Sequence, residues 1–137
     1  MIVLGIDTST DVLGVALVAD EETRFSYNTR GRYIHSERLF PVIDTALERA
    51  GITRRDLDLL AVAVGPGSFT GIRIGMAAAK ALAYSLRIPV VGVSTADVLA
   101  RPLAGEGQVC PVITARRGEV YWRLYRDGRA VHDHRAG

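Results

Sequence analysis

Three groups of residues in the first half of the chain are of types that could do chemistry. Asp7, Thr8 and Ser9 follow a short apolar run, His35 stands alone, and residues 65–75 read GPGSFTGIRIG. Carboxylate and hydroxyl oxygens can organise a magnesium–nucleotide site, histidine is a frequent zinc ligand, and a glycine-rich turn before a helix can hold phosphate. Each group also has a structural explanation, because aspartate, serine and glycine are common in turns.

The glycine-rich run does not match the two common phosphate-binding fingerprints. GxxxxGK[ST] and GxGxxG both require a glycine five positions after Gly65, where Thr70 stands, and no lysine lies where it would reach a phosphate. We therefore expect a tight turn from a strand into a helix, with glycine allowing a positive φ or a close approach. Ser68 or Thr70 is the expected N-cap. An anion held by the amides at this helix start is the alternative.

A metal site at His35 is not expected. Two histidines one helical turn apart can share a metal ion, but Leu39 occupies the position four residues after His35. His132 and His134 alternate on an expected strand, and a chance placement explains them better than a metal pair. We expect His35 to lie in a loop or at a helix end, and the chain to bind no metal.

The elements that must position these groups follow from hydrophobic periodicity and turn residues. The continuous apolar run 57–64 is typical of a parallel strand covered on both faces. Ser36 is the expected N-cap of the first helix, Gly51 its stop, and Thr95 the cap of a short third helix. The expected strands are 2–7, 12–20, 24–30, 57–64 and 90–94, and the expected helices 36–50, 70–86 and 96–100. This βββαβαβα order, an antiparallel meander followed by crossovers, describes an α/β ribonuclease H-like fold, which is also one lobe of the actin-like ATPase (ASKHA) architecture.

The end of the chain repeats the strand pattern of its beginning. Residues 108–115, 119–126 and 129–134 form three expected strands, with Asp127-Gly128 as a hairpin turn. We expect a first actin-like lobe at 1–106 and the incomplete start of a second lobe, a three-strand meander, at 107–137. That any two β-hairpins look alike is the alternative.

Composition limits the function classes. The chain has 137 residues, 48% of them hydrophobic, a formal charge of +2 and a single cysteine, Cys110. The charge is too small to argue for nucleic acid, and the single cysteine excludes an internal disulfide or a cysteine-rich zinc site. Neither a signal peptide nor a membrane-spanning run is recognisable, so we expect a cytoplasmic protein without membrane contact. Residues 116–135 are rich in arginine and aromatic residues and could contact nucleic acid, although solvated strand edges are the favoured explanation.

The second helix has an unusual outer surface. Arg73, Lys80 and Arg87 are spaced by seven and form one narrow stripe, flanked by apolar Met76 and Tyr84. Small residues on the opposite side permit close packing on the body of the protein. A helix covered on one side only should show a broad polar face, so we expect another protein to cover the outer side. The alternative is a further part of the same chain.

Five segments together resemble the bacterial TsaB (YeaZ) family, which acts in tRNA threonylcarbamoyladenosine (t6A) synthesis. They are IDTST, HSERLFPVID, AVGPGSFTGIRIGMAAAKALA, VVGVSTADVLA and ARRGEVYW, in order along nearly the whole chain. The resemblance implies an actin-like, non-catalytic subunit without a cofactor of its own. It would support the paralogue TsaD, which transfers the threonylcarbamoyl group to adenosine 37 of tRNA, with ATP and metal on the partner proteins.

The resemblance also implies partners and site residues. TsaD is the expected heterodimer partner and TsaE a third component; a homodimer forms through the same helices without TsaD, and tRNA is contacted indirectly. The expected partner surface comprises Leu39, Ile43, Leu47, Ile72, Arg73, Met76, Lys80, Ala83 and Tyr84. Asp7, Thr8 and Ser9 would form a vestigial nucleotide site, weakened because Thr114 replaces the matching aspartate of the second lobe. An actin-like nucleotide-binding enzyme using Asp7 and a glycoprotease-like metallopeptidase are the alternative functions.

Overall fold

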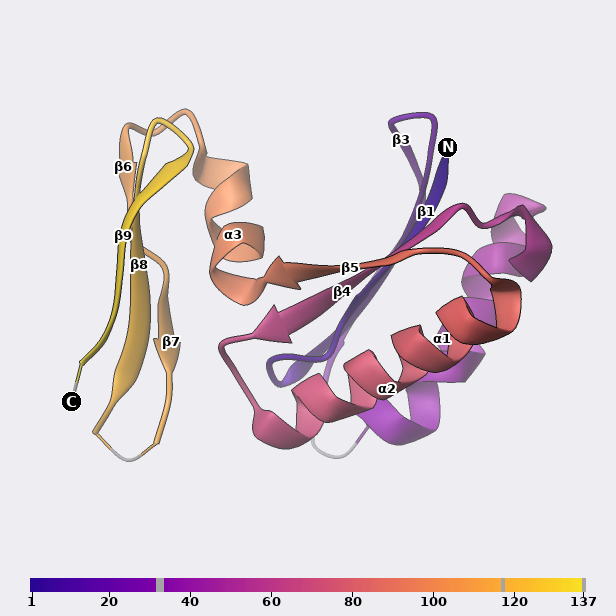
Figure 1. Cartoon of the computed structure of the whole chain (residues 1–137), viewed down its shortest axis with the longest axis horizontal. Helices are drawn as coiled ribbons and strands as arrows, with labels where there is room; N and C mark the ends of the chain where they lie inside the picture. The colour runs from indigo at the N-terminus through magenta and orange to yellow at the C-terminus, as the bar shows by residue number, and fades with distance from the viewer. Residues whose placement is uncertain (32–33, 117, 137) are drawn as a thin grey trace.

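The computed structural model describes residues 1–31, 34–116 and 118–136, the last four of these by their backbone alone. It contains two sheets, with the short helix α3 between them (Figure 1). The elements of the first part are β1 Ile2–Asp7, β2 Val12–Ala19, β3 Glu22–Arg30, α1 His35–Ala50, the 3-10 turn Arg54–Asp56, β4 Leu59–Gly65, α2 Phe69–Leu86, β5 Val90–Ser94 and α3 Thr95–Ala100. The predicted order βββαβαβα is confirmed.

The first sheet has five strands in the order β3-β2-β1-β4-β5. The first three strands pair antiparallel, whereas β4 pairs parallel with both β1 and β5. This is the arrangement that a meander followed by two helical crossovers produces. The carboxyl ends of β1 and β4 therefore lie side by side, which brings Asp7 near the glycine-rich turn after β4.

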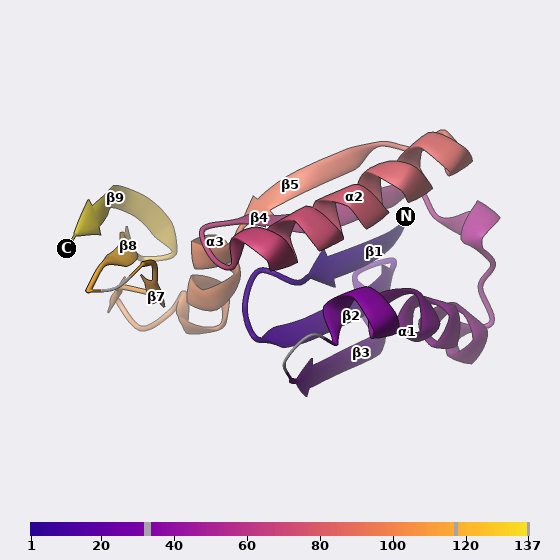
Figure 2. The same ribbon diagram turned by 90° about the horizontal axis from the view of Figure 1, so that it is seen from below.

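The hydrophobic core lies between this sheet and two helices on one of its faces. Helix α1 packs on β2 and β3, and α2 packs on β4, β1 and β5 (Figure 2). Alternate strand residues point toward the helices and are buried, because side chains alternate between the faces of a strand. They include Leu4, Ile6, Leu13, Val15, Leu17, Leu60 and Val62.

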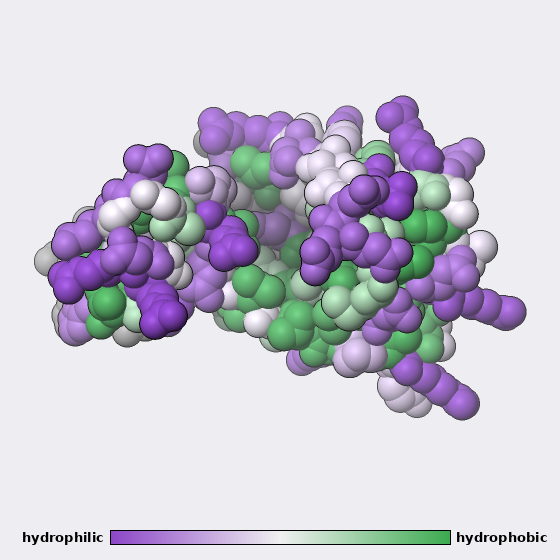
Figure 3. All heavy atoms as spheres, turned by 90° about the horizontal axis from the view of Figure 1, so that it is seen from above, coloured by the Kyte–Doolittle hydropathy of each residue, from purple (hydrophilic) through white to green (hydrophobic). Residues whose placement is uncertain are grey.

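The opposite face of the sheet corrects one prediction. β4 was expected to be covered on both faces, but in this chain helices α1 and α2 cover only one. A groove of about 240 Å³ crosses the other face, lined mainly by small residues such as Gly5, Ala16, Ala61 and Ala63, with Val98 of α3 at one end. Figure 3 shows hydrophobic residues gathered on this side of the molecule. With only six residues, α3 is too short to cover the sheet.

At the helix ends, two of the predicted cap or stop residues are confirmed and two predicted caps are wrong. Gly51 ends α1 with φ 64°, in the left-handed region that favours glycine, and Ser68 caps α2 by accepting from the amide of Gly71 at 3.2 Å. Ser36 is not the cap of α1, because the helix already begins at His35. Thr95 is the first residue of α3, and its hydroxyl donates instead to Ser9.

The second sheet has four strands where three were predicted. The expected strand 108–115 is divided into β6 Gln108–Val109 and β7 Val112–Thr114, both paired with β8 Val120–Arg126, whose other edge pairs with β9 Arg129–Ala136. Pro111 lies at the break, and proline has no amide hydrogen to donate to a neighbouring strand. The meander order is otherwise retained, while the division of the chain into lobes at residue 107 stays a prediction.

The second sheet is joined to α3 by polar contacts. Arg123 of β8 forms an ion pair with Asp97 of α3 at 3.0 Å, and the hydroxyl of Tyr125 donates to the same carboxylate. Arg123 is thus held toward the body of the protein. Of the other arginines in this predicted basic tail, Arg117 and the side chain of Arg135 lie outside the described residues, and contact with tRNA stays a prediction.

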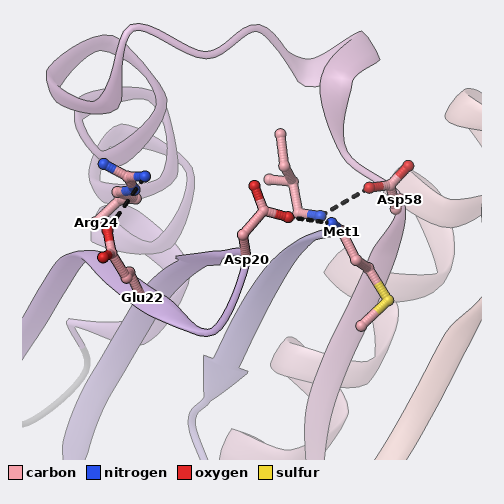
Figure 4. Close-up of polar contacts among 6 residues, drawn as sticks. Met1, Asp20, Glu22, Arg24 and Asp58 are labelled. Carbon is pink, nitrogen blue, oxygen red and sulfur yellow. Dashed lines mark hydrogen bonds and ion pairs between the residues drawn. The ribbon is translucent and has the colours of Figure 1, made fainter.

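The start of β1 is fixed by two carboxylates (Figure 4). The amino group of Met1 contacts Asp20 at 2.6 Å, and the amide of Ile2 donates to Asp58 at 2.7 Å. The hydrogen bond and the opposite charge raise the pKa of the Met1 amino group and lower the pKa of Asp20. These contacts hold the first strand against the β2–β3 turn and the segment before β4.

Candidate functional site

The glycine-rich run packs the start of α2 against the turn after β1. A Cβ atom at Gly67 would overlap the carbonyl oxygen of Ser9, and one at Gly71 would overlap that of Thr8. A Cβ atom at Gly75 would collide with the Thr8 hydroxyl. Gly71 and Gly75 are four residues apart and lie on one face of the helix start, and Gly67 lies in the turn just before the helix. They are therefore needed for a close approach of two backbone segments, as the sequence predicted.

The turn itself begins with an unusual backbone conformation. Gly65 has φ 101° and precedes Pro66 through a cis peptide bond. Positive φ is readily adopted only by glycine. The amide of Ser68 donates to the carbonyl oxygen of Ser9 at 2.7 Å, which closes the turn onto the end of β1.

The hydroxyl groups of the predicted nucleotide site already form hydrogen bonds within the protein. Thr8 donates to the carbonyl oxygen of Gly71 at 2.7 Å, and Ser9 donates to Asp7 at 2.6 Å while accepting from Thr95 at 2.9 Å. Thr8, Ser9 and Thr95 have almost no exposed surface. These hydroxyls hold β1, α2 and α3 together and do not point to a surface where a ligand could bind.

Asp7 differs from its neighbours because part of it reaches the surface. Its Oδ1 accepts from both the amide and the hydroxyl of Ser9, at 2.8 and 2.6 Å. The residue also lines the groove on the open face of the sheet, where Asn28 is another polar neighbour. One carboxylate oxygen thus has a structural role in the turn. The nucleotide site itself stays a prediction.

His35 is the first residue of α1, as predicted for a histidine at a helix end. Its Nε2 lies 2.8 Å from the carbonyl oxygen of Thr10, and the residue is 9% exposed. Within residues 1–31, 34–116 and 118–136, no group of three histidine, cysteine, aspartate or glutamate side chains could hold a metal ion.

The outer face of α2 carries exposed aromatic and basic side chains. Phe69 and Tyr84, at its two ends, are 75% and 90% exposed. Arg73 lies over the ring of Phe69 at 5.3 Å, an arrangement that favours a cation–π contact. Met76 is half-buried and Lys80 is exposed between them. At 100° per residue these side chains fall on one narrow stripe opposite Gly71 and Gly75.

The structure changes the membership of the predicted partner surface. Leu39, Ile43 and Leu47 are 1%, 1% and 5% exposed and belong to the core under the sheet, as does Ala83. These side chains have almost no surface to offer a partner, since those of α1 are used for packing in the core, mainly on β2 and β3. Ile72, Arg73, Met76, Lys80 and Tyr84 keep exposed surface. The interface as such stays a prediction.

Phe69 is the residue of this surface that sequence reasoning missed. It was treated only as part of the glycine-rich turn, before the expected start of the helix at Thr70. Its position four residues before Arg73 was the available signal, because residues at that spacing lie next to each other on a helix. The observed helix start at Phe69 places it on the stripe.

Known proteins resemble this chain in both sequence and fold. Residues 32–137 match the family model described as TsaD, tRNA N6-adenosine threonylcarbamoyltransferase. The tRNA threonylcarbamoyladenosine biosynthesis protein TsaB of Bacillus subtilis is 41% identical over 127 residues, which are 92% of this chain and 56% of that protein. The solved structure of YeaZ from Pseudomonas aeruginosa superposes with a TM-score of 0.87 at 34% identity, over 99% of this chain and 64% of that one. The chain belongs to the TsaB (YeaZ) family.

Membership of the TsaB family agrees with the predicted fold class. The ethanolamine utilization protein EutJ from Carboxydothermus hydrogenoformans superposes with a TM-score of 0.58 at 16% identity, over 97% of this chain and 50% of that one, which is a likeness of fold alone. This chain spans a little over half the length of the TsaB relative from B. subtilis. Among its described helices, none is both long and apolar enough to cross a membrane.

Proposed function

We propose that this chain is a non-catalytic subunit in t6A formation and that it acts by binding a TsaD-type transferase. The proposal is supported by the names of its relatives, which are tRNA threonylcarbamoyladenosine biosynthesis proteins. It is further supported by the internal use of the Thr8 and Ser9 hydroxyls, which leaves the actin-like site with few groups for chemistry.

The observation that carries the proposal is the exposed stripe on α2. Two aromatic side chains at its ends are at least three-quarters exposed. Exposed aromatic, methionine and arginine side chains on one helix face are the residue types that protein interfaces favour. A helix that presents residues at this spacing fits against another helix. The partner surface should therefore be helical, with apolar groups opposite Phe69 and Tyr84 and carboxylates opposite Arg73 and Lys80.

The proposal has further parts that concern partners and ligands. In the absence of the transferase, the stripe on α2 would pair with its own copy, giving a homodimer that competes with the heterodimer. ATP and metal would belong to the partner proteins, TsaD and the third component TsaE. Contact with tRNA would come through TsaD.

The test is the affinity of the purified chain for TsaD from the same genome. Tyr84→Ala should weaken binding by about thirtyfold or more, as truncation of an aromatic hot-spot residue does at an interface, and t6A formation in a reconstituted mixture should fall in parallel. Val112→Ala, which truncates an exposed residue of β7, is the matched control and should bind normally. Unchanged binding by Tyr84→Ala would contradict the interface.

A further inference from the structure

The two faces of the second sheet have different surroundings. On β8, Arg123 and Tyr125 contact Asp97 of α3, so their side chains lie on the face directed toward the first sheet. Figures 1 and 2 show α3 on this side, between the two sheets. Because side chains alternate along a strand, Trp122 and Arg126 lie on the opposite face, the outer face, which is turned away from the first sheet.

Two aromatic rings lie together on this outer face. The ring centroids of Trp122 and His132 are 5.5 Å apart, and the ring planes are tilted by 46°. His132 belongs to β9 and is the cross-strand partner of Leu124, which shares a face of β8 with Trp122. Trp122 is half-buried and His132 is exposed. The bases of unpaired nucleotides stack on aromatic side chains that a sheet presents in this way.

Two arginines lie on the same face at the hairpin end of the sheet. Arg126 and Arg129 flank the Asp127-Gly128 turn, are direct cross-strand partners and are both exposed. Like charges at such positions repel each other and destabilise the strand pair. Among the described side chains, neither guanidinium forms an ion pair with a carboxylate, that of Asp127 included. An anion bound by both arginines would relieve the repulsion, and phosphate matches the donor geometry of arginine.

We propose that the outer face of the second sheet binds a single-stranded nucleic acid. Bases stack on the rings of Trp122 and His132, and Arg126 and Arg129 bind the phosphate groups between them. Arg126 lies four residues after Trp122, about 13 Å along β8, a length that a few consecutive nucleotides span. An acidic peptide would satisfy the arginines but would leave the two rings without planar groups to stack on. This contact is direct and separate from any contact through the transferase.

Fluorescence anisotropy of the full chain tests the proposal, with labelled RNA and DNA oligonucleotides of one sequence and about ten nucleotides. At least one of them should bind saturably, and the tighter ligand shows which sugar the face prefers. A duplex of the same sequence should bind about tenfold more weakly, because its bases are not available for stacking. Equal binding of the duplex, equal binding of a polyglutamate peptide of the same charge, or no saturable binding would overturn the proposal.

Substitutions of the arginines test the phosphate contacts. Arg126→Gln and Arg129→Gln should each weaken binding. Each should also lower the slope of log affinity against log salt concentration by about 0.7, the value for one phosphate of a single strand. Arg55→Gln is the matched control, because it removes the same charge from an exposed 3-10 turn of the first lobe, and it should bind normally. Equal losses in Arg55→Gln and Arg129→Gln would contradict a defined site.

Substitution of the histidine tests stacking. His132→Ala should weaken binding about tenfold, as the loss of one stacked base does, and should leave the salt dependence unchanged. Unchanged affinity in a folded His132→Ala protein would contradict the proposal. If a variant of the second sheet does not fold, the comparison of single strand, duplex and polyglutamate on the unaltered chain still decides. These titrations contain no transferase, so their failure would not bear on the interface proposed for α2.

Discussion

The hydroxyl of Thr8 donates to the carbonyl oxygen of Gly71 at 2.7 Å, and the two residues are separated by 63 positions in the chain. The same glycine lies so close to Thr8 that a Cβ atom would overlap the Thr8 carbonyl oxygen. The glycine-rich run is therefore a packing element between the end of β1 and the start of α2. It positions the outer stripe of α2.

Replacing Gly71 by alanine should destabilise the protein. Alanine stabilises a helix interior by about 1 kcal/mol relative to glycine, but the added methyl group would displace backbone atoms, and such overpacking costs about 1–3 kcal/mol or more. Because the overlap is with backbone atoms, the upper end of this range applies, and after the helix gain we expect a net loss of about 2 kcal/mol in the free energy of unfolding, measured by urea denaturation. Gly105→Ala is the matched control, because a Cβ atom there meets nothing within 4 Å. Equal stability of the two variants would show that the close approach is not needed.

The Asp7 carboxylate should prove more important for stability than for ligand binding. Asp7→Ala removes the acceptor of two hydrogen bonds from Ser9 and should cost about 1–3 kcal/mol. Asp7→Asn keeps an acceptor oxygen and should cost less. Calorimetry with Mg-ATP should give no saturable binding to the unaltered chain. Clear micromolar binding that Asp7→Asn abolishes would instead support the actin-like enzyme.

The sequence predicted the fold because its local signals agree with one another. Alternation in the first three strands, the apolar run of β4 and the glycine at position 51 each point to the element that is observed. Element boundaries were predicted less accurately. The predicted N-cap of α1, Ser36, was wrong because the helix begins one residue earlier, at His35, whose side chain forms a long-range hydrogen bond with Thr10. Periodicity does not contain such long-range contacts.

The candidate site was predicted less well than the fold. The spacing of Arg73 and Lys80 identified the outer side of α2, since helical geometry fixes that side. It could not decide that Leu39 and Ile43 are buried, because the width of an apolar arc does not say how many neighbours cover it. Nor could it show that Nδ1 of His35 is buried without a hydrogen-bond partner among the described residues, which depends on how distant segments pack.

Two serines provide a matched test of helix capping. Ser68 caps α2 through its hydroxyl, so Ser68→Ala should cost about 1 kcal/mol of stability. Ser36 was the expected cap of α1 but lies inside the helix and is exposed, so Ser36→Ala should change the stability by less than about 0.5 kcal/mol. Thermal unfolding of both variants distinguishes the two roles. A larger effect at Ser36 would place the N-cap of α1 at Ser36, two residues after the observed N-cap, Ile34.

The contact between Tyr125 and Asp97 predicts how stability changes in alkaline solution. Burial raises the pKa of the Tyr125 hydroxyl above its ordinary value of 10.0, and its hydrogen bond to Asp97 raises it further. The unfolded chain therefore loses this proton at a lower pH than the folded one. The resulting stabilisation is fully present below about pH 10 and is lost as the pH rises through the higher folded pKa.

Tyr125→Phe should remove that pH dependence along with the hydrogen bond. Denaturation curves from about pH 9 upward should show the unaltered chain losing stability more steeply than the variant. Below that range the variant should be less stable by about 1 kcal/mol, the usual net value of one hydrogen bond. Tyr84→Phe makes the same one-atom change at a side chain that is 90% exposed and should follow the unaltered chain. Parallel curves for Tyr125→Phe and the unaltered chain would mean that this hydroxyl does not link α3 to the second sheet.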